Sequence, residues 1–353
     1  MADQNNNEED YTVINCNLPK DAVERILFKS VCKSWYNFIK SCNVIKIYRN
    51  NQISRPPSAI ISYKKIMLYN FPINQQLSLP FAIDDTKDWG NFEFCYNGLI
   101  CLTKDIYASP VVILWNPASR RYKCINIPFE CSRFTYLKLG FHQQSNDYKI
   151  LKVPFQTRIY TLSSGSWKTI LFTLLSLTVA WGPQISVDGF VYWLGTRGVE
   201  FIICFDLIKD KFKLMDVPDD CGFDRELVRR KLMVLRGSLA MIVSVEDCTR
   251  DTEIWMLVKG NSHLQLYLWT KKFILEPFSK ETTTLGMWNN HKLLVVVSQT
   301  HPHALRQVYS YDLVTKETEY FHLPKEQDLA SFVAVRGCYF ESLELEDGSD
   351  RRY

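Results

Sequence analysis

Histidine is scarce in this chain of 353 residues, and recognised catalytic motifs are missing from it. None of the six histidines lies in a His-Glu-x-x-His motif, and the chain contains no Gly-x-Ser-x-Gly or phosphate-loop motif. His301 and His303 flank Pro302 at a spacing that could place two imidazoles on one side of an extended segment, as a metal site needs. No cysteine or acidic residue lies close by, so a loop is the simpler interpretation. The sequence therefore predicts a non-catalytic protein that needs no cofactor and no metal.

The chain also lacks a dense block of basic residues and an arrangement of cysteines typical of disulfide or zinc proteins. Its net charge of +4 is the difference between 42 basic and 38 acidic residues, which does not favour nucleic acid as a partner. The eleven cysteines are an odd number and include no Cys-x-x-Cys pair, so they indicate free thiols in a reducing compartment. We therefore expect a protein of the cytoplasm, or of the cytoplasm and the nucleus.

Long hydrophobic runs are missing as well. The most apolar run, Thr169 to Trp181, has 13 residues and contains Thr and Ser, so it is too short to span a bilayer. The N-terminal MADQNNNEED is polar and acidic, with neither the basic nor the apolar region of a signal peptide. Residues 1–16 are predicted to form a disordered tail, and no membrane partner is expected.

Residues 17–50 predict a helical segment. Pro19 suits the first turn of a helix, and Asp21 and Glu24 are acidic residues near the positive end of its dipole. Apolar residues then recur at spacings of three and four, which predicts one apolar stripe that must be covered by the chain's own C-terminal domain or by a partner: Val23, Ile26, Leu27, Val31, Trp35, Phe38 and Ile39.

This segment resembles a plant F-box. LPKDAVERIL is similar to the opening of that module and FKSVCKSWYNFIKS to its closing part, but Leu27 runs straight into Phe28, where the family has further residues. In the family, the F-box binds a Skp-type adaptor that links it to a cullin ubiquitin ligase. The resemblance implies that the adaptor-binding residues are Leu18, Pro19, Val23, Ile26, Leu27, Val31, Trp35 and Ile39.

The rest of the chain is predicted to be mostly β, with a repeat. After a predicted linker at residues 51–60, polar turns separate short apolar runs at Asn97-Gly98, Asn146-Asp147, Asp188-Gly189, Arg236-Gly237, Asn290-His291 and Arg336-Gly337. The second residues of these turns are 42 to 54 positions apart. Between them lies a second series, in which an apolar strand ends in a polar turn and resumes on an aromatic residue: Tyr122, Trp167, Phe212, Phe273 and Tyr320.

Two hairpins in each repeat are what a four-stranded propeller blade needs, because a single blade must stack on its neighbours to bury both faces. We therefore predict a β-propeller of about six blades over residues 61–345, followed by a tail at 346–353. Five or seven blades remain possible, because Ile66 to Ile83 could form a partial first blade that closes the ring with the C-terminal strand. A paired β-sandwich is the competing fold.

Several phrases of this region also resemble, in order, the F-box-associated domain of plant F-box proteins, including the S-locus F-box and F-box/kelch-repeat groups. They include NGLICL, ILWNPASRRYKCINIP, VDGFVYWL and FDLIKDKFKLMDVP. The resemblance implies a substrate-recognition subunit of a Skp-cullin-F-box ubiquitin ligase, whose propeller binds a target protein. The alternative is a propeller interaction module that has lost adaptor binding through its shortened F-box.

Three polar segments are candidates for the surface that binds this target, because exposed loops on one face of a propeller commonly bind partners. They are DIYASP at residues 105–110, DDCGFDRELVRRK at 219–231 and EDCTRDTE at 246–253. Simple solvation of charged loops would explain the same composition. The predicted substrate-binding residues are Asp105, Arg225, Arg229, Arg230 and Asp247.

Overall fold

The computed structural model describes the strands and many of their connections between residues 58 and 352. The described ranges are 58–63, 65–70, 73–76, 92–96, 99–104, 110–116, 121–128, 136–142, 144–145, 147–153, 157–170, 178–179, 184–196, 199–218, 228–245, 250–259, 267–276, 282–287, 291–297, 307–321, 334–339 and 351–352. The chain divides into two compact units, Met1–Ile47 and Tyr48–Tyr353, and every described element belongs to the second. The predicted tail, the helical segment and all eight predicted adaptor-binding residues lie outside the described residues.

The described elements are all strands, and they form six sheets, numbered here along the chain. The last two described strands of the chain, β25 and β26, belong to the first two sheets. Sheet 1 contains β1 (Ser58–Tyr63), β2 (Lys65–Asn70), β3 (Ile73–Gln76) and β25 (Ala334–Tyr339). Sheet 2 contains β4 (Phe92–Tyr96), β5 (Leu99–Lys104), β6 (Val111–Asn116), β7 (Arg121–Asn126) and β26 (Arg351–Arg352). Sheet 3 contains β8 (Tyr136–His142), β9 (Asp147–Val153), β10 (Arg158–Thr161) and β11 (Ser166–Thr169).

The remaining three sheets follow the same plan. Sheet 4 contains β12 (Thr178–Val179), β13 (Ile185–Val187), β14 (Phe190–Thr196), β15 (Glu200–Asp206) and β16 (Lys211–Asp216). Sheet 5 contains β17 (Val228–Leu235), β18 (Ser238–Val245), β19 (Thr252–Lys259) and β20 (Tyr267–Leu275). Sheet 6 contains β21 (Thr282–Met287), β22 (Lys292–Val297), β23 (Gln307–Asp312) and β24 (Thr318–Phe321).

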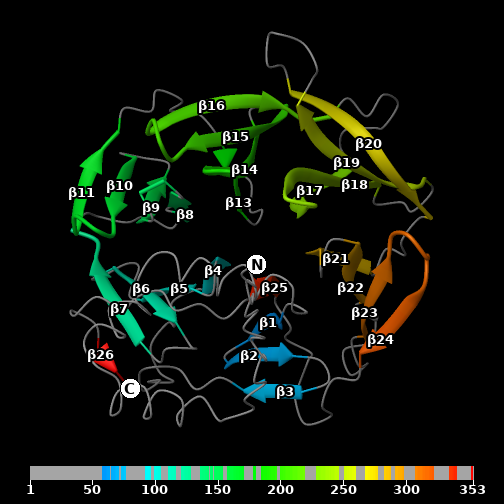
Figure 1. The fold of residues 1–353 in the computed structure, drawn as a ribbon, viewed down its shortest axis with the longest axis horizontal. Coiled ribbons are helices and arrows are strands. Elements are labelled where there is room, and N and C mark those ends of the chain that lie inside the picture. Colours follow the sequence, from blue (N-terminus) through cyan, green and yellow to red (C-terminus); the bar gives the residue numbers. More distant parts are fainter. Residues whose placement is uncertain are drawn as a thin grey trace, which may run out of the picture. The chain divides into compact units, whose positions relative to one another are not determined.

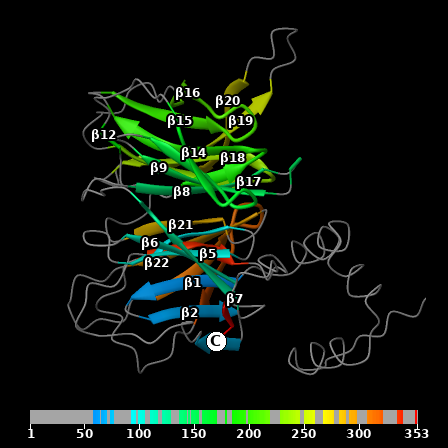
Figure 2. The same cartoon turned by 90° about the vertical axis from the view of Figure 1, so that its left-hand side faces the viewer.

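The sheets surround a common axis, with one strand of each sheet on the inside (Figure 1). The inner strands contact one another in order, from β4 through β8, β13, β17 and β21 to β25, and β25 returns to β4. This closed order confirms the predicted mostly-β propeller and excludes the paired sandwich. Figure 2, turned by 90°, shows β1 and β2 of sheet 1 side by side.

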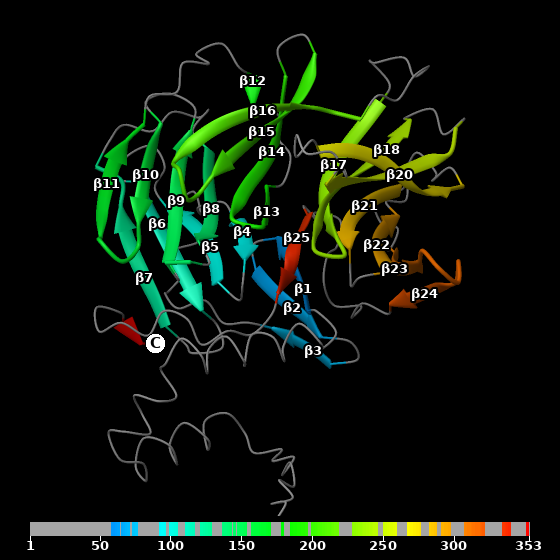
Figure 3. The ribbon, with the colours of Figure 1, turned by 45° about the horizontal axis from the view of Figure 1, so that its top comes forward.

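Sheet 1 joins the two ends of the described chain. β25 pairs antiparallel with β1, with Ala59 opposite Cys338 and Ser62 opposite Ala334 (Figure 3). The expectation that strands near Ile66 to Ile83 share a sheet with the C-terminal strand is therefore confirmed. β1 begins within the predicted linker at 51–60, and β26 lies within the predicted tail at 346–353.

The predicted two-residue turns were correct in two positions. Asp188-Gly189 and Arg236-Gly237 join strands whose flanking residues are directly opposite, and both residues of each turn have positive φ angles between 51° and 78°. Positive φ at both positions is the geometry of a type I′ turn, which matches the twist of a hairpin. Asn97-Gly98 lies outside the described residues, between the paired Tyr96 and Leu99.

Three other predicted turns were wrong or displaced. Arg336-Gly337 lies inside β25, which has no following strand in its sheet because β1, from the other end of the chain, already occupies that position. Asp147 is the first residue of β9 and pairs with His142, so that turn is longer than two residues. The turn near His291 is also longer, since Met287 pairs with Leu293.

The aromatic series was predicted correctly for four residues, since Tyr122, Trp167, Phe212 and Tyr320 lie on the strand that follows the polar turn, β7, β11, β16 and β24. The prediction was wrong for Phe273, because the expected turn before it lies inside β20, which extends from Tyr267 to Leu275. Each of the four is directly opposite an aromatic residue of the preceding strand, and the ring centroids of three such pairs are 4.7 to 5.5 Å apart. These pairs are Trp115 with Tyr122, Tyr160 with Trp167, Phe205 with Phe212, and Tyr309 with Tyr320.

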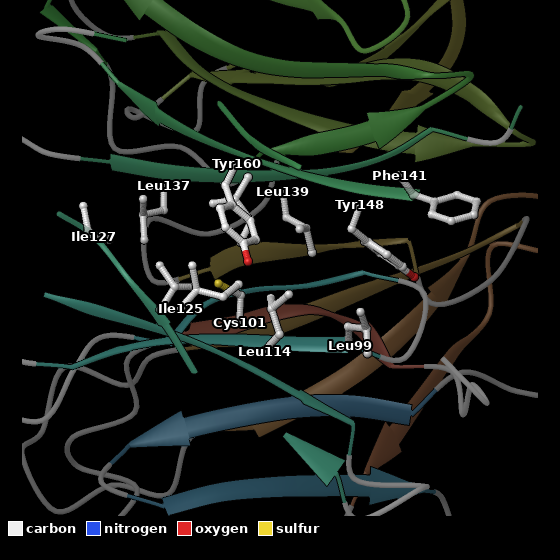
Figure 4. Close-up of a cluster of buried hydrophobic side chains, with 12 residues drawn as sticks. Leu99, Cys101, Leu114, Ile125, Ile127, Leu137, Leu139, Phe141, Tyr148 and Tyr160 are labelled. Atoms are coloured by element: carbon white, nitrogen blue, oxygen red, sulfur yellow. The ribbon is translucent and has the colours of Figure 1, made fainter. Parts of the chain in front are cut away.

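The core lies between successive sheets, so the middle strands are buried on both faces. In β15, Ile203 and Phe205 pack toward sheet 3, whereas Ile202 and Cys204 pack toward sheet 5. This explains why such strands appear in the sequence as continuous apolar runs. Figure 4 shows the equivalent layer between sheets 2 and 3, where Leu99 and Leu114 face Leu139 across the interface.

Candidate partner-binding surface

The strand directions give the second unit two different faces. In sheet 4, the connection from β14 to β15 (residues 197–199) lies at one end of β15, and the turn from β15 to β16 (residues 207–210) lies at the other. We call the first face the long-loop face, since it also carries the connections between successive sheets, and the second the short-turn face, which carries the tight hairpins. Contacts between sheets 3 and 4 fix their common orientation: the short-turn-face ends of β9 and β15 meet where Lys149 Nζ donates to the carbonyl oxygen of Leu207 at 2.7 Å.

The strand ends that flank the three polar segments predicted to bind a target belong to the long-loop face. Asp105 lies between β5 and β6, Asp247 between β18 and β19, and Arg225 between β16 and β17. These three residues are outside the described residues, but the strand ends that flank each of them belong to this face. Asp105 and Asp247 are 142 positions apart in the chain, and the strand ends that flank them lie on the same side of the propeller.

Two of the predicted substrate-binding residues lie elsewhere than expected. Arg229 and Arg230 were predicted to lie in the polar loop, but β17 begins at Val228, so both belong to a strand. The Arg230 side chain is only 7% exposed and forms an ion pair with Glu200 of sheet 4. Arg230 thus ties two sheets together, which is a structural role, whereas Arg229 is exposed on the strand.

Lys231 connects sheet 5 to its other neighbour, sheet 6. Its Nζ donates to the carbonyl oxygen of Thr284, in β21 of sheet 6, at 2.6 Å. Side chains alternate between the two faces of a strand, so consecutive basic residues point toward different neighbouring sheets. The roles of Arg230 and Lys231 were missed from the sequence because VRRK was interpreted as a loop. In the strand, Leu232 packs toward sheet 4 and Met233 toward sheet 6. The same alternation places Arg230 toward sheet 4 and Lys231 toward sheet 6.

Other ties between sheets also escaped sequence reasoning. The Gln184 side chain accepts from the backbone N–H of Leu139 at 2.9 Å and donates to the Leu139 carbonyl oxygen at 2.7 Å, in the manner of a strand neighbour. The Trp167 and Trp269 indole N–H groups each donate to a carbonyl oxygen at the end of the preceding sheet's fourth strand, Asn126 and Asp216. The hydrogen bond from Trp269 to Asp216 has no local signal in the sequence, because the two residues are 53 positions apart.

Comparison with known proteins agrees with this architecture. The family model of the F-box associated beta propeller domain matches residues 34–344. The chain belongs to the F-box-associated β-propeller family. The F-box protein At5g65850 of Arabidopsis thaliana is 22% identical over 332 residues, which cover 88% of this chain and 79% of the relative. The F-box/kelch-repeat protein At3g23880 of the same plant is 23% identical and covers 72% of this chain and 78% of the relative. A chain from the crystal structure of a nidogen/laminin complex is 11% identical, with a TM-score of 0.45 and coverage of 80% of this chain and 96% of that chain.

In the described part of this F-box-associated propeller, no group of three His, Cys, Asp or Glu side chains is arranged to hold a metal ion. His301 and His303 lie outside the described residues. The described residues also include no helix long and apolar enough to cross a membrane.

Cys101, Cys124 and Cys204 of the propeller carry thiols that are not in disulfide bonds. Burial raises the pKa of the Cys204 thiol to about 12, although a hydrogen bond with Tyr192 opposes that shift. Because the thiolate is the reactive form, Cys204 has the character of an inert core residue.

Lys231 gives the propeller a pH-dependent stability. Burial lowers the pKa of its ammonium from 10.5 to about 8, so the folded state binds fewer protons than the unfolded state between these values. The cost of burying the charge is present in full below about pH 8 and disappears as the pH rises toward 10.5. Relative to Lys231→Met, the wild-type free energy of unfolding is therefore expected to rise by about 2 kcal/mol between pH 7.5 and 9.5.

Urea unfolding at a series of pH values measures this difference, and Lys272→Met, at an exposed position of β20, is the matched control for loss of one positive charge. A wild-type curve parallel to that of Lys231→Met over the whole range would contradict the buried position of the ammonium.

Proposed function

We propose that this chain is the substrate-recognition subunit of a Skp-cullin-F-box ubiquitin ligase and that its target protein binds at the long-loop face. The observation that carries the proposal is that the described strand ends flanking the three predicted polar segments all belong to this face. The family match over residues 34–344 and the F-box proteins among the relatives support it. Exposed loops held by a rigid scaffold are a common place for binding residues.

In this proposal the two parts of the chain have separate roles. The apolar stripe of residues 17–50 binds the Skp-type adaptor by hydrophobic burial, with Leu18 and Pro19 at its start. The propeller holds the target, and the linkage raises the effective concentration of the target's lysines near the ligase. This role is non-catalytic and uses no cofactor, and it suits a protein of the cytoplasm, or of the cytoplasm and the nucleus.

In this proposal the six sheets are six blades of one ring. Each sheet has at least four strands, and sheet 1 is completed by strands from both ends of the described chain. A ring closed in this way presents its long-loop face as a continuous rim, on which residues from several blades can contact one target.

A second candidate function is a propeller that binds its partner without causing ubiquitination. The observation in its favour is the direct junction of Leu27 and Phe28, where F-boxes of this kind have further residues. A shortened module re-spaces the apolar residues that would face the adaptor. Only the adaptor link separates the two candidates, since both use the same propeller surface.

Site-specific photo-crosslinking tests the choice of face. A photoreactive amino acid is placed at Val199, on the long-loop face, and in a separate variant at Ile208, on the short-turn face of the same sheet. The two side chains are matched in exposure, 52% and 50%. Expressed in plant cells with the cullin ligase inhibited, the Val199 variant is expected to give discrete crosslinked partners that the Ile208 variant does not.

Equal crosslinking from the two positions, or crosslinking from Ile208 alone, would contradict binding at the long-loop face. A partner that crosslinks at Val199 and accumulates when the ligase is inhibited supports the receptor role. A partner that crosslinks there but keeps the same abundance supports the second candidate.

A further inference from the structure

The outer edge of sheet 5 is unusual among the outer edges of this propeller. β20 is the last strand of its sheet, so one row of its backbone N–H and C=O groups has no strand partner in the described part of the chain (Figure 1). It has nine residues and is the longest described strand, whereas the outer strands β11 and β24 have four each and β16 has six. A long open edge is a template on which another strand can pair.

The side chains of this edge are both apolar and basic. Tyr267, Leu268 and Ile274 are each 59% exposed, whereas β16 and β24 carry one such exposed large apolar residue each. The strand has no acidic residue and contains Lys271 and Lys272. Lys271 is in an ion pair with Glu253 of β19 and lies 4.9 Å from the centre of the Trp255 ring, which holds this basic side chain in place.

A β-bulge divides the edge into two parts. Phe273 pairs with Ile254 and Lys271 with Trp255, so Lys272 has no residue opposite it. The regular part is Tyr267–Lys271, which pairs continuously with β19. On it, Tyr267, Trp269 and Lys271 share one face of the sheet and Leu268 lies on the other, because neighbouring side chains alternate.

The same propeller already shows strand addition at an outer edge. β26, from the end of the chain, pairs antiparallel with β7 and makes sheet 2 five-stranded, with Arg351 opposite Tyr122. A segment distant in sequence thus adds to the outer strand of a completed sheet. β20 offers the equivalent position on sheet 5 with more length and with exposed apolar side chains.

We propose that the Tyr267–Lys271 edge of β20 binds an extended acidic peptide of a partner protein by adding it as a fifth strand to sheet 5. Backbone hydrogen bonds to the open edge supply affinity, and side chains at alternate positions supply selectivity. Apolar residues of the peptide pack on Tyr267 and Leu268, and its carboxylates are attracted to Lys271 and Lys272. A second copy of β20 would bring these lysines toward like charges, which is unfavourable across a strand pair. This docking edge does not depend on adaptor binding or on the long-loop face.

Two model peptides of equal length test the proposal, one alternating glutamate with valine and the other alternating lysine with valine, both capped and fluorescently labelled. Binding to the full chain is followed by fluorescence anisotropy, and the docking position by hydrogen exchange of the amides of Tyr267–Lys271. The glutamate peptide is expected to bind with a Kd of about 0.1 mM or below and to slow exchange in this segment, whereas the lysine peptide binds at least about tenfold more weakly.

Leu268→Asp removes an apolar contact and adds a repelling charge, so it is expected to weaken binding of the glutamate peptide by about tenfold. Val314→Asp likewise replaces an exposed apolar side chain with aspartate, in the turn between β23 and β24 of sheet 6, and is the control, with an expected change below about twofold. Equal binding of the two peptides, equal effects of the two substitutions, or no slowing of exchange in Tyr267–Lys271 would overturn the proposal. So would self-association of the chain that Leu268→Asp abolishes, because the edge would then be occupied by a second copy.

Discussion

Replacing Phe205 with alanine is expected to lower the free energy of unfolding of the propeller by about 3–5 kcal/mol. Phe205 is fully buried between sheets 3 and 4, and its ring centroid is 4.7 Å from that of Phe212. Removing the ring loses its transfer free energy and leaves a cavity that the rigid sheets on both sides cannot fill. The expected loss of stability is large because Phe205 belongs to the buried layer that holds sheets 3 and 4 together.

Urea unfolding followed by tryptophan fluorescence measures this loss. Leu214→Ala is the control, because Leu214 is an apolar residue of the same sheet whose side chain is 47% exposed, and its substitution is expected to cost less than about 1 kcal/mol. Similar losses for the two variants would mean that Phe205 is not packed between sheets 3 and 4.

Arg230→Glu is expected to destabilise the propeller by about 3 kcal/mol or more, rather than only weaken the binding of a partner. The Arg230 side chain is almost fully buried and is in an ion pair with Glu200. Charge reversal places two carboxylates together in a poorly solvated position, where neither has a cationic partner. Glu200 is 32% exposed, so water screens part of the repulsion and limits the loss.

The charge swap separates this structural role from a role in binding. Glu200→Arg combined with Arg230→Glu restores an ion pair of opposite sign, so the double variant is expected to be more stable than Arg230→Glu by at least about 1 kcal/mol. Arg229→Glu, at the exposed neighbouring position, is expected to leave stability within about 0.5 kcal/mol of wild type. A wild-type unfolding midpoint for Arg230→Glu would contradict the buried ion pair.

Local features of the fold could be predicted from the sequence because their causes are local. Asp188-Gly189 adopts positive φ angles at both positions and joins directly opposed residues, as the dipeptide between two apolar runs predicts. Trp167 and Phe212 mark the outermost strand of their sheets because each is directly opposite an aromatic residue of the adjacent strand across a short turn. The propeller could be predicted because the two-residue turns, and the aromatic residues that follow polar turns, recur along the chain.

Features that depend on distant partners could not be predicted in this way. Arg336-Gly337 has the composition of a turn, yet it lies in a strand because β1, nearly 280 positions earlier, supplies its neighbour. Arg230 has the character of a surface residue until Glu200, 30 positions earlier, is placed beside it by the stacking of two sheets. Pair partners between sheets are set by the closed ring, which no short stretch of sequence encodes.

Adaptor binding tests the central claim, the receptor role, most directly. The purified full chain is tested against a plant Skp-type adaptor in a pull-down, beside a version with family-typical residues restored between Leu27 and Phe28 and a Val31→Asp variant of the apolar stripe. The receptor role predicts that the natural chain retains the adaptor and that Val31→Asp releases it. Binding by the restored version alone would contradict the claim and identify this chain as a propeller uncoupled from the ligase.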